Sequence, residues 1–105
     1  MTRPSLTARI KIGDARLYLV LVLDGNGNIA ELVLPVAQCV GAELELICKL
    51  ANLALKHGAG IDAVMGLFRG TRFEPAGACP TVEGIVSSPA DAVAKVIERW
   101  QAVKP

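Results

Sequence analysis

The sequence predicts an α+β fold: a three-stranded antiparallel β-meander followed by two or three helices that pack on one face of the sheet. Residues 6–35 contain apolar or alternating runs separated by Gly- and Asn-rich turns, a pattern typical of strands. From Val36 onward, apolar residues recur with helical spacing instead. At 105 residues the chain is expected to form a single domain, 1–105, with its own core.

The first half of the chain contains the three predicted strands. "LTARIKI" (6–12) alternates apolar and polar residues, and "GD" (13–14) marks a tight turn into "ARLYLVLVLD" (15–24). This second strand is apolar on both faces, so we expect it to lie in the middle of the sheet. "DGNGN" (24–28) is the next turn, and "IAELVLP" (29–35) is a third strand that ends at proline.

The second half of the chain contains the predicted helices. "AQCVGAELELICKLANLALKHG" (37–58) has an apolar stripe at helical spacing, and its final glycine suits a helix end. "IDAVMGLFRG" (61–70) predicts a shorter helix, whereas "TRFEPAGACPTVEG" (71–84) is rich in Pro and Gly and predicts a loop. In the last helix Ser88 is placed to cap, Pro89 takes the first helical position, and Asp91 follows three residues after the cap.

The predicted helices cover one face of the sheet and leave the other open, although the middle strand is apolar on that side too. We therefore expect the other face to lie in an oligomer interface, most simply that of a twofold homodimer. The longest apolar run, "LYLVLVL" (17–23), is far shorter than the roughly 20 residues of a membrane helix. The N-terminus lacks the apolar segment of a secretory signal, so a cytoplasmic location without membrane attachment is expected.

No catalytic constellation is visible in the sequence. His57 lies at a predicted helix end, and nothing in the sequence places a nucleophile beside it. Cys39, Cys48 and Cys79 lack metal-ligand spacing, so we expect no metal and no cofactor. Cys48 is expected to be buried in its helix, whereas Cys79, in the predicted loop, is the candidate for a reactive thiol.

Basic residues form the candidate binding surface. They comprise Arg9, Lys11 and Arg16 near the first hairpin, and Arg69 and Arg72 further along the chain. Arg9 and Lys11 share the polar face of the first strand, where they suit contact with phosphate or nucleic acid. Alternatively, these charges protect an edge strand from pairing with another chain. The strands also lack the aromatic pattern of RNA-binding sheets.

Several segments match one known family in their order and spacing. They are Arg3-Pro4, "LYLVLVLDGNGN" (17–28), "AELVL" (30–34), Cys39, "ICKLANLALKHG" (47–58), "LFRGTRFEP" (67–75) and "SSPADAVAKVI" (87–97). With them the chain resembles the TSCPD domain, found near the C-terminus of adenosylcobalamin-dependent (class II) ribonucleotide reductases and in small stand-alone proteins. The family-signature positions are Cys39, Ser87, Ser88, Pro89 and Asp91. Ser88 stands where the family has its signature cysteine, and Ala90 shifts the aspartate by one residue.

The resemblance implies a non-catalytic accessory module, because the reductase radical site lies outside this domain. Such a module would act as a homo-oligomer on a reductase-type protein or on nucleic acid. The alternative is a small regulator that binds a nucleotide or other ligand between sheet and helices, near Arg69, Arg72 and the 71–84 segment. An enzyme that uses Cys39 or Cys79 as a thiol is the third and weakest hypothesis.

Overall fold

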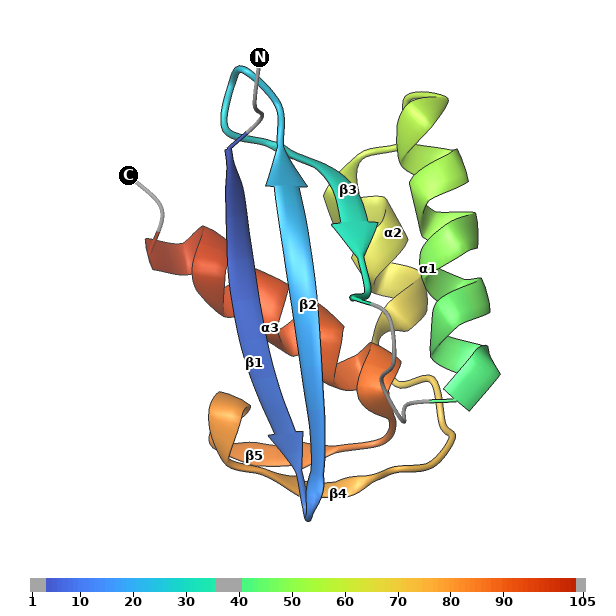
Figure 1. Ribbon diagram of the computed structural model, residues 1–105, viewed down its shortest axis with the longest axis vertical. Coiled ribbons are helices and arrows are strands. Elements are labelled where there is room, and N and C mark those ends of the chain that lie inside the picture. The colour runs from blue at the N-terminus through green and yellow to red at the C-terminus, as the bar shows by residue number, and fades with distance from the viewer. Residues whose placement is uncertain (1–3, 36–40, 104–105) are drawn as a thin grey trace.

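The computed structural model describes residues 4–35 and 41–103. It contains a three-stranded antiparallel sheet with helices behind it (Figure 1). The strands lie in the order β1 (Ser5–Ile12), β2 (Ala15–Leu23) and β3 (Ile29–Val33). The predicted α+β meander is confirmed.

The two turns of the meander use different devices. Gly13, in the β1–β2 turn, has a φ of 57°, a left-handed conformation that glycine adopts without steric cost. In the β2–β3 turn the Asp24 carboxylate accepts hydrogen bonds from the backbone N–H groups of Asn26 (2.8 Å) and Asn28 (3.0 Å). The side chain of Asp24 therefore holds the turn that the Gly- and Asn-rich sequence predicts.

A bulge bends β3 around the core. Val22 pairs with Glu31 but Leu23 pairs with Ile29, so Ala30 is the extra residue on β3. Ile29 and Leu32 are consequently both buried although they lie three residues apart, a spacing that a regular strand would place on opposite faces.

Other groups bond to the backbone at both edges of the sheet. At the β3 edge the Leu32 N–H donates to the Asn52 side-chain oxygen (2.7 Å), and the Asn52 amide donates to the Leu32 carbonyl (2.8 Å). At the β1 edge the Lys11 N–H donates to the Thr81 hydroxyl (3.1 Å) and the Gly13 N–H to the Ala78 carbonyl (2.8 Å). Each edge of the sheet is thus satisfied over part of its length.

The helices are α1 (Gly41–Lys56), α2 (Ile61–Phe68) and α3 (Pro89–Val103). Figure 1 shows α3 crossing behind β1 and β2, and α1 running beside β3. The apolar side of α1 is buried through Leu44, Cys48 and Ala51, and α3 buries Val93, Ala94 and Ile97 completely. The first residues of the predicted 37–58 helix, with Cys39, lie outside the described residues.

The prediction of a loop over 71–84 is wrong in its second half. Residues 77–86 form a small hairpin, with β4 (Gly77–Cys79), a 3₁₀ turn η1 (Pro80–Val82) and β5 (Gly84–Val86). Glu83, between η1 and β5, has a left-handed φ of 54°. Strands of three residues are too short to show alternation, and their packing against the β1–β2 hairpin is a tertiary effect that local composition does not reveal.

Candidate functional site

The family-signature residues build the buried start of α3. The Ser88 hydroxyl caps the helix by accepting the Asp91 N–H (3.0 Å), and Pro89 occupies the first helical position. One Asp91 carboxylate oxygen accepts the Gly70 N–H (2.9 Å), and the other accepts the Ser87 N–H (2.9 Å). The carboxylate therefore ties the end of α2 to the beginning of α3.

Asp91 is held in its charged form. Burial raises the pKa of this carboxyl, since the side chain is only 2% exposed. The N–H groups of Gly70 and Ser87, together with the Lys95 ammonium 3.1 Å away, outweigh burial and leave the pKa below its ordinary value. A carboxylate with these partners is suited to join backbone segments, not to exchange protons with a substrate.

The described cysteines are buried. Cys48 is 4% exposed, and burial raises the pKa of its thiol to about 12, so it carries no thiolate near neutral pH. The expectation that Cys79 lies in an accessible loop is wrong, because Cys79 ends β4 and is 1% exposed. Among residues 4–35 and 41–103, no three His, Cys, Asp or Glu residues gather where a metal ion could be held.

Three of the predicted binding residues share the open face of the sheet. Ile10, Ile12 and Leu17 point into the core, so their neighbours Arg9, Lys11 and Arg16 point away from it, and all three are exposed. Lys11 lies directly opposite Arg16 across β1 and β2.

An aromatic side chain lies beside these cations. In the next pair on the same face, Arg9 lies opposite Tyr18, which is 42% exposed. Two adjacent cross-strand pairs on this face thus carry three cations and one aromatic ring. The sheet lacks the several aromatics of RNA-binding sheets, as expected, yet Tyr18 occupies a position where one could stack.

Arg69 and Arg72 do not join this group. Arg69 follows α2 in the helix layer, and its guanidinium forms an ion pair with Glu98 of α3. Arg72 lines a shallow hollow of about 570 Å³ together with Phe73 and Ile85. The sequence grouped five basic residues, and the structure separates these two from the three on the open face.

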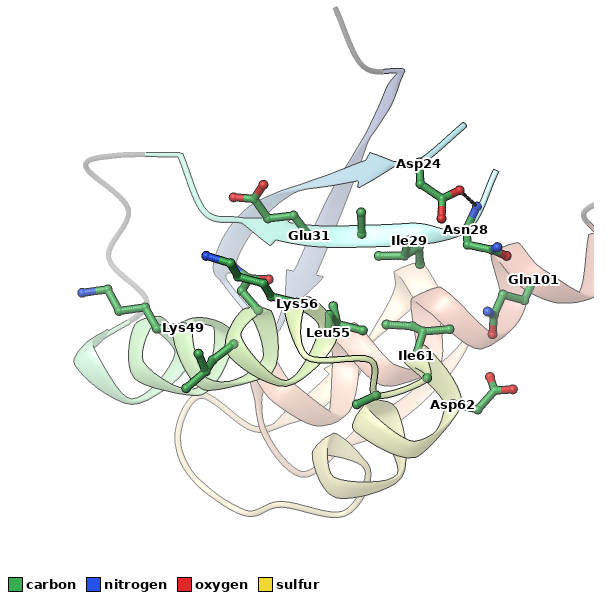
Figure 2. Close-up of a pocket in the computed structure, with 15 residues that line it drawn as sticks. Asp24, Asn28, Ile29, Glu31, Lys49, Leu55, Lys56, Ile61, Asp62 and Gln101 are labelled. Atoms are coloured by element: carbon green, nitrogen blue, oxygen red, sulfur yellow. Dashed lines mark hydrogen bonds between the residues drawn. The ribbon is translucent and has the colours of Figure 1, made fainter. Parts of the chain in front are cut away.

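A large cleft opens between the sheet and the helices. It measures about 1090 Å³, between β3, α1 and the beginning of α2, away from Arg69 and Arg72 (Figure 2). Its charged lining is mixed, with Asp24, Glu31 and Asp62 against Lys49 and Lys56. Sequence reasoning missed this cleft, because it is lined by β3, α1, the beginning of α2 and Gln101 of α3, which only folding brings together.

No helix in the described part of the chain has the length and apolar character needed to cross a membrane.

His57 is exposed just beyond the end of α1.

The meander, the helices behind it and the capped start of α3 define a small α+β domain without a visible catalytic centre in its described residues. A model of the TSCPD domain family matches residues 1–101, and the chain belongs to this family. It is therefore a domain of the type associated with ribonucleotide reductases. No significant match is found among curated proteins or among solved structures.

Proposed function

We propose that this TSCPD domain is a non-catalytic accessory module that binds single-stranded nucleic acid through the open face of its sheet. The observation that carries the proposal is the pairing of Lys11 with Arg16, beside the pair of Arg9 and Tyr18. Like charges directly opposite one another destabilise a sheet, and no ion pair among the described residues includes these three cations. Binding of an anionic partner would relieve the repulsion between Lys11 and Arg16, and this relief would contribute to the binding free energy.

Protection of an edge strand explains this arrangement only in part. Charged residues often guard edge strands, and Arg9 and Lys11 do lie on the edge strand β1. Arg16 lies on β2 outside the stretch that pairs with β3 (residues 20–23), so it too lies at an open edge. Guarding that edge, however, does not require Arg16 to lie directly opposite another cation, Lys11. The exposed Tyr18 ring adds a stacking surface, and stacking on an aromatic side chain is a general means of holding unpaired bases.

The test is binding of a fluorescein-labelled 20-nucleotide oligothymidine, followed by anisotropy at several salt concentrations. Lys11→Gln with Arg16→Gln should weaken binding at low salt by tenfold or more. It should also reduce the slope of log K against log salt by about 1.4, since each phosphate contact on a single strand contributes roughly 0.7. Tyr18→Ser should weaken binding by roughly five- to 150-fold through lost stacking, about 1–3 kcal/mol.

The matched control removes two exposed cations from α1, with Lys49→Gln and Lys56→Gln, and should bind almost as the unaltered protein does. Equal losses in both double variants would show that only overall charge matters and would contradict the proposal. Absence of salt-dependent binding by the unaltered protein would also contradict it, and would favour a reductase-type protein as the partner.

The cleft beside β3 favours a second candidate function, a regulator that binds a small ligand. About 1090 Å³ is enough to enclose a small molecule. Its three carboxylates and two lysines suit a polar ligand of mixed charge better than a polyphosphate. A ligand-dependent rise in melting temperature that Asp62→Asn abolishes, with nucleic-acid binding unchanged, would support this function.

A further inference from the structure

The outward face of α1 carries a stripe of exposed leucines. Leu46, Leu50 and Leu53 are 58%, 57% and 55% exposed, while the opposite side of the same helix is packed in the core. Leucine side chains that gather on a surface mark a place where burial against another molecule would release free energy. The Glu45–Lys49 pair (3.3 Å) lies beside this stripe.

The stripe has the spacing of a helix–helix seam. Glu43, Leu46, Leu50, Leu53 and His57 follow one another in steps of three, four, three and four residues. This repeat places the first four positions along one side of α1, and His57, one residue beyond the end of α1, continues the same spacing with its N–H bonded to the Leu53 carbonyl (3.2 Å). It is the pattern of side chains in paired helices. Glu43 and His57, which end the seam, are also exposed.

We propose that α1 pairs with α1 of a second copy of this chain, antiparallel about a twofold axis at Leu50. In this arrangement Leu50 meets Leu50 of the second copy, and Leu46 meets Leu53. Glu43 at each end meets His57, so a carboxylate faces an imidazole that can donate a hydrogen bond to it. A parallel pair would place Glu43 against Glu43, so the end charges select the antiparallel orientation.

Two further features of α1 fit this arrangement. Antiparallel helices bring the negative C-terminal end of one beside the positive N-terminal end of the other, with Glu43 in the first turn and Lys56 in the last. Lys49 would approach Lys49 of the second copy near the axis. Its ammonium already lies 3.3 Å from the Glu45 carboxylate, so the two lysines do not face one another as isolated charges.

A second copy suits this surface because a twofold axis places the same patch on both sides, and the seam complements itself. The helix has 16 residues, and a single pair of helices this short buries less than a standard interface. We therefore expect the dimer to dissociate on dilution. It differs from the sheet-face dimer that the sequence predicts, and it leaves Arg9, Lys11 and Arg16 accessible. The inference does not depend on nucleic-acid binding.

The experiment measures molar mass by light scattering and sedimentation over a hundredfold range of concentration. The unaltered protein should shift from monomer to dimer, and Leu50→Arg should raise the dissociation constant at least tenfold without changing the circular dichroism spectrum. Leu67→Arg is the matched control, because Leu67 is 81% exposed on α2 and outside the seam. A monomer at every concentration, or a dimer that survives Leu50→Arg, would overturn the inference.

The orientation has its own test. Glu43→Lys should weaken the dimer, and the further change His57→Glu should restore it, because each end of the seam then carries a lysine opposite a glutamate. The disulfide test uses a Cys39→Ser background, in which chains with Leu46→Cys are mixed with chains with Leu53→Cys. On oxidation, a disulfide should join one chain of each kind. Disulfides between two Leu46→Cys chains instead would indicate a parallel pair and overturn the antiparallel arrangement.

Discussion

The beginning of α3 and the outward face of α1 present opposite arrangements of polar and apolar groups. At the beginning of α3, the polar residues Ser88 and Asp91 are buried and bonded to backbone. On α1, apolar leucines are exposed to solvent. The comparison teaches that the signature segment "SSPAD" stabilises the fold, whereas the candidate binding residues are exposed and none of them is a family-signature position. Substitutions can test this division, because buried and exposed positions should differ in their effect on stability.

The largest effect is expected from Asp91→Ala. The substitution leaves the N–H groups of Gly70 and Ser87 without an acceptor and should cost about 3 kcal/mol of unfolding free energy. Urea unfolding followed by circular dichroism measures it, and Leu50→Arg on the exposed stripe should stay within about 0.5 kcal/mol of the unaltered protein. Similar losses in both variants would erase the distinction between the two regions.

Asn52→Ala should have an intermediate effect. Asn52 is polar and lies on α1, but its amide bonds to both backbone groups of Leu32 at the β3 edge. Its removal should cost about 1–2 kcal/mol, because both groups lose a partner in a partly buried place, offset slightly by the better helix propensity of alanine. The control Lys49→Ala changes an exposed position on the same helix and should be nearly neutral in the same urea assay.

The smallest of these effects is the contribution of Asp91 to acid sensitivity. Because the pKa of Asp91 in the folded protein lies below the ordinary value of an aspartate, the unfolded chain takes up the proton first on acidification. The stability that the charge provides is complete above about pH 4–5 and is lost as pH falls through the lowered pKa. Asp91→Asn should flatten this part of the pH–stability profile. An unchanged slope would show that other carboxylates account for it.

Local patterns predicted the elements whose signals are local. The hairpin turns, the apolar stripe of α1 and the Ser88 cap each depend on residues within one or two turns of chain, and the structure contains all of them. The hydrogen bond from the Gly70 N–H to the Asp91 carboxylate was not predictable, since Gly70 lies 21 residues away and contacts Asp91 only after α2 and α3 pack. The burial of Cys79 was missed for the same reason, because β4 packs against β1.

The open face of the sheet shows what sequence alone could and could not predict. Alternation placed Arg9 and Lys11 on one side of a strand, and the structure has them there. The register of β1 against β2 brought Arg16 and Tyr18 beside them, and register depends on the turn as well as on the strands. Arg69 and Arg72 were grouped with them by charge alone, a property that does not determine position.

The amide of Asn52 also affects how the protein behaves at high concentration. Strand edges with unsatisfied backbone groups recruit other chains into continuous sheets, which is the first step toward fibrils. Asn52 on one side, with Thr81 and Ala78 on the other, occupies such groups at Leu32, Lys11 and Gly13. Growth of the sheet by strand addition is therefore opposed at both margins. A concentrated solution should stay clear, and Asn52→Ala should be the first variant to turn cloudy.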